Sequence, residues 1–267
     1  MPDTPPDYRE QPARAELHEF VKTVWSLDEA GRTAEAVLPD GCIDIVWRDG
    51  FGLVCAGPDT GPVTVQRLPG STIVGVRFRP GAAPAVLGVP ADALRDLRTP
   101  LADLWGPTAD RLEESLTVAH STRARHEILQ AHLASRLTSG ERPDRRVAGA
   151  VAMLKANGFR HVNRLGDAIG ISERQLRRRF HATVGYGPKT LARILRLQRL
   201  LALASRGELA RVGLAGIALA AGYTDQAHMT AECTRLAGKP PARLIAARAA
   251  AEVERVRFLK EMPLAVA

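Results

Sequence analysis

In the second half of the chain, four basic residues stand at the spacing that would place them on one face of a helix. On a helix these residues, at positions i, i+3, i+4 and i+7, would share one face, opposite the apolar Leu176 and Phe180. Arginine on such a face can donate paired hydrogen bonds to the O6 and N7 atoms of guanine or to a phosphate group. This stripe of basic side chains could therefore recognise nucleic acid, although a solvent-exposed basic face would show the same spacing. The four residues are Arg174, Arg177, Arg178 and His181.

The stripe lies inside a local pattern that occurs twice. In both copies a helical segment ends at a glycine, Gly170 or Gly222, whose tolerance of the left-handed backbone permits a tight turn. Ser172 and Asp225 then stand where a second helix needs a capping side chain. Helix, tight turn and second helix describe a helix-turn-helix unit, whose second helix enters the major groove of DNA. The two predicted units span about residues 162–182 and 214–236.

A single helix is predicted to join the two units. Pro188 suits a helix start, and no helix-breaking residue interrupts the sequence from there to Ser205. About 17 residues at about 1.5 Å each give a rod of about 26 Å. Such a rod could hold two recognition helices about one DNA turn apart, in successive major grooves on one face of the duplex.

The predicted DNA contacts fall on the second helix of each unit. The second unit is much less basic than the first, so we expect the first unit to be the main anchor on DNA. In the first unit the predicted contacts are Ser172, Arg174, Gln175, Arg177, Arg178 and His181. In the second unit they are Gln226, Ala227, His228 and Thr230.

These residues resemble the DNA-binding domain of the AraC/XylS family of bacterial transcription regulators. GISERQLRRRF followed by GYGPK, and IALAAGYTDQAHMT followed by GKPPARL, are similar to the two family motifs, and the resemblance covers about residues 145–248. The family commonly has phenylalanine, arginine and phenylalanine where this chain has Met229, Ala231 and Cys233, so one usual DNA contact is missing. The resemblance implies an all-α domain that binds double-stranded promoter DNA in the cytoplasm, with RNA polymerase as a further partner.

The first half of the chain shows a different pattern, typical of β structure. Between Glu19 and Arg79, short apolar or alternating runs such as CIDIVW and STIVGVRF are separated by turn residues. LPDGCIDIVW and GVRFRPGAA are similar to a subset of the same regulators, which implies an antiparallel, cupin-like β-barrel that binds a small-molecule effector or forms a homodimer. The predicted fold class is thus α+β, with accessory helices after the barrel. Candidate effector contacts are Trp25, Trp47, Arg77 and Arg79.

The charge distribution indicates two domains. The 267 residues carry a formal net charge of +8, but residues 1–140 hold 14 Lys and Arg against 19 Asp and Glu, whereas residues 141–267 hold 23 against 10. A strongly basic second half suits a polyanionic partner such as DNA. We predict a β-rich sensor or dimerisation domain at 1–140 and a DNA-binding domain at 141–267. A leucine stripe at 122–138 could be buried against the first domain or form a dimer seam.

Composition and sequence pattern exclude several classes of protein. Hydrophobic residues make up 45% of the chain, yet no apolar run approaches the length of a membrane span, and the acidic, proline-rich start has no export signal. We therefore expect a cytoplasmic protein with no membrane partner. No histidine lies between His18 and His120, where a metal-binding cupin would need ligands on its strands. We expect no metal, no cofactor, no catalytic residues and no enzymatic activity.

Two other functions stay open as alternatives. Cys42, Cys55 and Cys233 are too scattered for a disulfide scaffold, and buried structural thiols are the favoured interpretation, with a thiol redox sensor as one alternative. The other alternative is a small-molecule-binding protein whose helical domain mediates an interaction other than DNA binding. Three histidines at spacings of six do not share a helix face and are expected at the surface: His120, His126 and His132.

Overall fold

The chain folds around two separate hydrophobic cores. The computed structural model describes residues 7–28, 34–66, 68–137, 142–156 and 162–247. One core is built by residues between Ala13 and Leu133, and the other by residues between Val147 and Ile245. The first is formed by strands with accessory helices and the second by helices, so the predicted α+β class and its order along the chain are confirmed.

The strands of the first half form two antiparallel sheets. The larger sheet has the strand order β1-β2-β7-β4-β5-β8, and β3 pairs with β6 in the smaller one. In the described part of the chain both sheets are open, so the predicted barrel-like domain consists of two open antiparallel sheets. The strands are β1 (Asp7–Gln11), β2 (Val21–Asp28), β3 (Ala34–Val37), β4 (Asp44–Arg48), β5 (Gly52–Ala56), β6 (Val63–Gln66), β7 (Thr72–Phe78) and β8 (Arg98–Pro100).

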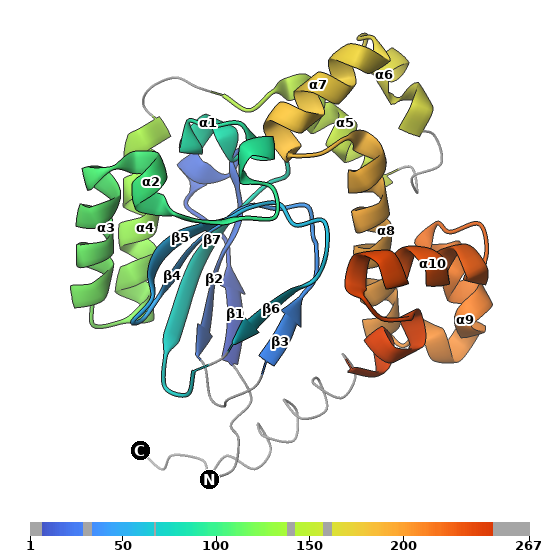
Figure 1. Cartoon of the computed structure of the whole chain (residues 1–267), viewed down its shortest axis with the longest axis horizontal. Coiled ribbons are helices and arrows are strands. Elements are labelled where there is room, and N and C mark those ends of the chain that lie inside the picture. Colours follow the sequence, from blue (N-terminus) through green and yellow to red (C-terminus); the bar gives the residue numbers. More distant parts are fainter. Residues whose placement is uncertain (1–6, 29–33, 67, 138–141, 157–161, 248–267) are drawn as a thin grey trace.

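The two faces of the larger sheet have different chemistry. Alternation along the strands places the apolar side chains of Ile45, Trp47 and Val76 on one face, which is buried beneath the accessory helices. The opposite face carries Asp44 and Arg77, which are paired in register. Figure 1 shows the helices α2, α3 and α4 on one side of this sheet and the β3–β6 pair on the other.

All of the accessory helices except η1 follow β7 in the chain. Their main packing element is α4, in which Leu129 and Leu133 are almost fully buried in the first core. Of the two interpretations of the leucine stripe, burial against the first domain is therefore the one that the structure supports. These elements are η1 (Ala15–Leu17), α1 (Pro84–Leu87), η2 (Ala91–Leu94), α2 (Leu101–Trp105), α3 (Pro107–Val118) and α4 (Thr122–Leu137).

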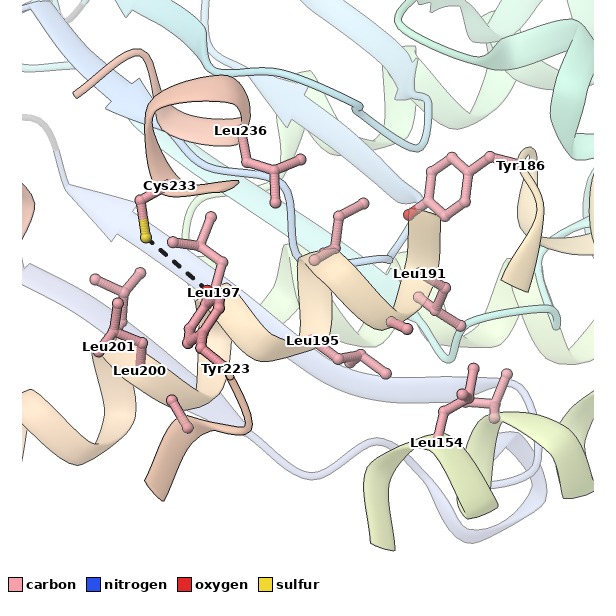
Figure 2. Close-up of a cluster of buried hydrophobic side chains, with 14 of the residues drawn as sticks. Leu154, Tyr186, Leu191, Leu195, Leu197, Leu200, Leu201, Tyr223, Cys233 and Leu236 are labelled. Carbon is pink, nitrogen blue, oxygen red and sulfur yellow. Dashed lines mark hydrogen bonds between the residues drawn. The ribbon is translucent and has the colours of Figure 1, made fainter. Parts of the chain in front are cut away.

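The second half is helical, and one long helix organises it. The helix α8 contributes Leu191, Leu197 and Leu200 to the centre of the second core, and Figure 2 shows helices from both ends of the domain packing their side chains on this row. The elements are α5 (Arg145–Ala156), η3 (Val162–Arg164), α6 (Leu165–Ala168), α7 (Glu173–Val184), α8 (Pro188–Ser205), α9 (Glu208–Ala221) and α10 (Gln226–Ala237).

The two halves touch where α7 turns into α8. The backbone at Gly185 lies so close to the first half that an added Cβ atom would be 2.5 Å from Pro58 Cγ. Arg95 donates a hydrogen bond of 3.4 Å to the carbonyl of Gly185, and farther along α8 the Gln198 amide donates one of 2.6 Å to the carbonyl of Pro39. The end of the first recognition helix is thus fixed against the β-rich half.

The structure corrects one expectation about the histidines of α4. His126 is buried, at 5% exposure, where a surface position was expected. Its ring Nδ1 lies 2.7 Å from the amide nitrogen of Gln11, and its Nε2 lies 2.9 Å from the carbonyl oxygen of Trp25. These contacts join α4 to β1 and β2, and burial lowers the pKa of His126.

No helix among the described residues is both long and apolar enough to cross a membrane.

Candidate nucleic-acid interface

The first helix-turn-helix unit is formed by α6, a tight turn and α7. Gly166 lets the two helices approach, because a Cβ atom there would lie 2.7 Å from the carbonyl oxygen of Ile171. Gly170 occupies the left-handed region with a φ of 68° and makes the turn. Leu176 and Phe180 of α7 are buried in the second core, as their spacing predicts. The sequence therefore forms this unit locally, through two glycines and two apolar anchors.

Ser172 and Gln175 cap the start of α7. The Ser172 hydroxyl oxygen accepts a hydrogen bond from the backbone N–H of Gln175, and the Gln175 carboxamide oxygen accepts one from the backbone N–H of Ser172, both at 3.2 Å. This reciprocal arrangement is a capping box. Both residues were predicted to contact DNA. In the structure each of them also caps the end of the helix that would enter the groove.

The basic stripe lies on the solvent side of α7. Arg174, Arg177 and Arg178 are exposed, and His181, one turn farther along, is half-buried. A fourth arginine, Arg179, points away from the stripe and forms an ion pair with Asp144 at the start of α5. Three guanidinium groups are thus presented together on the first half of α7, which is the part of a recognition helix that contacts base edges.

The second unit is formed by α9, a turn and α10. The backbone of α9 is kinked at Gly213, where φ is 66° and ψ is −178°, so the part after the kink acts as the first helix of the unit. Gly222 has a φ of 97° and ends that helix. The Asp225 carboxylate then accepts a hydrogen bond of 2.7 Å from the backbone N–H of His228 and caps α10. The predicted turn and cap are therefore present in both units.

Thr224, in the turn of the second unit, contacts the ring of His228. The ring Nδ1 accepts a hydrogen bond from the Thr224 backbone N–H, and it also lies 3.0 Å from the Thr224 hydroxyl. On the other side of the ring, Nε2 lies 3.1 Å from Glu232 Oε1. The ring also meets the edge of Tyr223. His228 is half-buried in this network, so the structure does not place it on the exposed face where a base contact was predicted.

The exposed face of α10 is formed by two adjacent ridges of side chains. Between the two ridges lies a shallow, open depression. Its middle is lined by small alanine and threonine side chains, and the longer side chains of a glutamine and an arginine stand at its two ends. Three of the four contacts predicted for the second unit, Gln226, Ala227 and Thr230, lie on this face. The lining residues are Gln226, Ala227, Thr230, Ala231, Thr234 and Arg235.

Glu232 is a buried carboxylate that sequence reasoning missed. It lies on the inner side of α10, where Arg196 of α8 donates hydrogen bonds of 2.7 and 2.8 Å to its two oxygens. Arg193, one turn earlier on α8, lies 3.2 Å away. The cluster fixes the second recognition helix to the connecting helix. A glutamate in this helix looks solvent-exposed in the sequence, and its main partner, Arg196, is 36 residues away.

The connecting helix has the predicted bounds, from Pro188 to Ser205. Its 18 residues correspond to a length of about 27 Å. Figure 1 shows α7 near one end of α8, with α9 and α10 beside its other part. The Tyr223 hydroxyl and the Cys233 sulfur, 3.9 Å apart, pack against this helix in Figure 2. One continuous rod thus carries both recognition helices.

The four candidate effector contacts do not form one site. Trp25 and Arg77 meet at Asp44, which accepts a hydrogen bond of 3.0 Å from the indole Nε1 and bonds of 3.0 to 3.2 Å from the guanidinium. Trp47 lies on the opposite face of the sheet, fully buried beneath the helices, with the Arg125 guanidinium over its ring. The fourth residue, Arg79, is exposed and donates to the carbonyl of His18.

The three cysteines are all buried, and none of them forms a disulfide bond. Burial raises the pKa of the Cys55 thiol to about 12 and that of Cys233 to about 11, and it also raises the pKa of Cys42. A redox-active cysteine needs the opposite, a thiolate stabilised near neutral pH. These thiols therefore act as small apolar side chains, and the geometry does not favour the thiol-sensor alternative.

Comparison with known proteins gives two kinds of similarity. Among solved structures, the chain is similar to ToxT from Vibrio cholerae, at 9% identity and a TM-score of 0.45, with 91% of this chain and 98% of that chain covered. It is also similar to an apo ToxT variant from Vibrio cholerae strain SCE256, at 11% identity and a TM-score of 0.44, with 89% and 99% covered. No curated protein matches the chain.

Two family models match separate parts of the sequence. A domain of unknown function, DUF6597, matches residues 9–100, which contain the end of β1 and the whole of β2 to β8. A helix-turn-helix domain matches residues 165–247. The second match spans both predicted units and the helix between them.

Proposed function

We propose that this chain is a DNA-binding transcription regulator of the AraC type, and that its two helix-turn-helix units bind successive major grooves of promoter DNA. The observation that carries the proposal is the exposed arginine stripe on a helix held at one end of α8, with a second recognition helix farther along the same rod. Recognition helices fixed on one rigid element can enter the grooves without rearranging.

The first unit is the main anchor in this proposal. Arg174, Arg177 and Arg178 supply base contacts to guanine and salt-dependent contacts to phosphates, and His181 lies at the end of the same stripe. Ser172 and Gln175 add contacts at the start of the helix while they cap it. Because each arginine that neutralises a phosphate releases counterions, binding through this helix weakens as salt rises.

The second unit contributes Gln226, Ala227 and Thr230 from the exposed face of α10. We assign His228 a positioning role in place of the base contact, since its two ring nitrogens are engaged by Thr224 and Glu232. This helix has one charged side chain on its exposed face, Arg235, so it adds little to the salt-dependent part of the affinity.

The β-rich half is proposed as the sensor or dimerisation domain. Two separate cores support a boundary near residue 140, with 1–140 as one domain and 141–267 as the DNA-binding domain. The polar face around Trp25, Asp44 and Arg77 is the candidate place for a small-molecule effector, and Trp47 and Arg79 are removed from that site. A homodimer, RNA polymerase as a partner on the promoter, and a cytoplasmic location complete the proposal.

The test is selection of bound duplexes from random-sequence DNA by the full chain. We expect a two-part motif whose halves are about 10 base pairs apart, the spacing of one helical turn. Titrations of the enriched duplex at two salt concentrations should show a steep loss of affinity as salt increases. Failure to enrich any sequence, with only salt-dependent binding to all duplexes, would overturn the proposal.

A further inference from the structure

The exposed face of α10 is a surface of methyl groups. Ala227 and Ala231 each present a Cβ methyl, and Thr230 and Thr234 stand beside them on the same two ridges. We call these four residues the methyl face. Among the residues that the structure describes, its neighbours in the depression are Gln226 at the start of the helix and Arg235 near its end.

The threonines of this face use their hydroxyl groups within the helix. The Thr230 hydroxyl donates a hydrogen bond of 2.9 Å to the carbonyl of Gln226, and the Thr234 hydroxyl donates one of 2.8 Å to the carbonyl of Thr230. A hydroxyl turned back to the carbonyl four residues earlier leaves the γ-methyl group on the exposed side. These threonines therefore offer an apolar contact to the groove, and their hydroxyl protons are not available to bases.

The carboxylate and the imidazole ring of α10 lie away from this face. Glu232 and His228 lie on the inner side, in the cluster with Arg196 of α8. Ala231 stands where the AraC/XylS family commonly has arginine. It therefore presents a methyl group where those proteins present a guanidinium group. The second recognition helix thus lacks the long cationic side chains of α7 on its central exposed turn.

In the major groove a methyl surface matches one chemical feature, the C5-methyl group of thymine. Alanine and the methyl of threonine contact this group, and glutamine pairs with the N6 and N7 atoms of adenine. We propose that the second unit recognises an A·T-rich half-site, with the methyl face against thymine methyl groups and Gln226 on an adjacent adenine. The first unit, by contrast, recognises a half-site that contains guanine. This inference rests on the proposed function, and it names the DNA sequence that each half of the interface fits.

Replacing thymine by deoxyuridine tests the inference, because it removes the C5-methyl and keeps all hydrogen-bonding groups. The probe is the duplex enriched from random DNA, with the replacement made in one half-site at a time. We expect an affinity loss of about threefold to fourfold for each contacted methyl in the A·T-rich half, since one buried methyl contributes about that much. The same replacement in the guanine-containing half should leave the affinity unchanged.

A matched pair of variants assigns the effect to α10. Thr230→Ser keeps the hydroxyl and removes the γ-methyl, whereas Thr230→Val keeps a methyl in that place and removes the hydroxyl. The serine variant should lose part of the difference between thymine and uracil, and the valine variant should keep it. Circular dichroism melts of both variants verify that α10 is folded.

The outcomes separate this inference from the function beneath it. Specific binding to an enriched site whose second half is not A·T-rich, or is unaffected by deoxyuridine, overturns the inference and leaves the DNA-binding function in place. Equal discrimination by wild type and Thr230→Ser also counts against it. If no sequence is enriched at all, the proposed function fails and the inference fails with it.

Discussion

Arg196 of the connecting helix binds both carboxylate oxygens of Glu232 on the second recognition helix. The two side chains are only 12% and 11% exposed, so the pair is largely removed from water. His228, which follows the cap of α10, lies against the same carboxylate. The orientation of α10 relative to α8 therefore depends on one charged cluster as well as on the apolar core.

Removing the carboxylate should loosen the second unit specifically. In Glu232→Ala the Arg196 guanidinium stays in place without its partner, and breaking a buried pair in this way costs about 3 kcal/mol. All three tryptophans lie in the first half of the chain, with Trp47 and Trp105 in its core and Trp25 on the opposite face of the larger sheet, whereas the second half is helical. We expect the urea transition followed by far-UV circular dichroism to shift to lower urea, and the transition followed by tryptophan fluorescence to shift much less.

A matched control is Glu127→Ala, which removes a carboxylate from the exposed i,i+4 pair with Arg123 on α4. Exposed pairs contribute little to stability, so this variant should unfold like the wild type. Equal shifts for the two variants would show that the Glu232 cluster does not fix α10.

The arginines of α7 should determine affinity for the enriched duplex. Arg174→Ala or Arg178→Ala should each cost about 1–3 kcal/mol in binding if the side chain contacts a guanine, and a phosphate contact should instead weaken binding to all sequences equally. Arg123→Ala, on a helix of the first domain, serves as the control. Gel-shift titrations that give wild-type affinity for both single variants and for the double variant would reject this role for the stripe.

The contact between the halves can be tested at the turn after α7. Gly185 has a φ of 94°, and an added Cβ would lie 2.5 Å from Pro58 Cγ and 3.1 Å from the carbonyl oxygen of Ala91. Gly170 also has positive φ, but its Cβ would point into open space. Gly170→Ala therefore measures the backbone strain alone, about 1–2 kcal/mol, and Gly185→Ala adds the clash with the first domain.

We expect Gly185→Ala to unfold at clearly lower urea than Gly170→Ala, with the tryptophan-detected transition shifted as well. Deletion of residues 1–140 should abolish the difference between the two variants, provided that circular dichroism shows the remaining chain to be folded. Equal destabilisation in the full chain would mean that the two halves do not press on each other at Gly185.

The sequence was sufficient to predict the features that depend on near neighbours. The glycine turns, the caps at Ser172 and Asp225 and the apolar anchors Leu176 and Phe180 are all set within a few residues, and the structure has each of them. The bounds of the connecting helix follow from Pro188 and from the uninterrupted run after it. Local conformational preferences decide these features, and they are visible in one segment of sequence.

The features that escaped prediction depend on partners far along the chain. His126 is buried because Gln11 and Trp25 come to it from strands more than 100 residues earlier. The alternation of side chains along a strand could not show that Trp25 and Trp47 lie on opposite faces of the sheet with only Trp47 beneath the helices. Which face is covered depends on the packing of α2 to α4. Similarly, the side of α10 on which the ring of His228 lies depends on the ion pair between Glu232 and Arg196. These two residues are far apart in the sequence, so their contact could not be predicted from residue spacing.

Asp44 should make the stability of the first domain depend on pH. Burial raises its pKa from 3.8 to about 6, against the opposing effect of the Arg77 guanidinium and with a further increase from Asp40. Because the folded state binds this proton more tightly than the unfolded state, the resulting stability is present below about pH 4 and is lost as the pH rises through 6. The change between these limits should be about 2–3 kcal/mol.

The matched variant for this prediction is Asp44→Asn, whose carboxamide oxygen can still accept from Trp25 and Arg77 but has no proton to lose. Tryptophan-detected urea unfolding between pH 4 and 7 should show the wild type losing stability relative to the variant as the pH rises. Carboxylates elsewhere in the domain titrate in both proteins, so the difference between the two curves isolates the Asp44 proton. Parallel curves would mean that Arg77 keeps Asp44 ionised across the whole range, and that the polar face of the sheet carries a permanent ion pair.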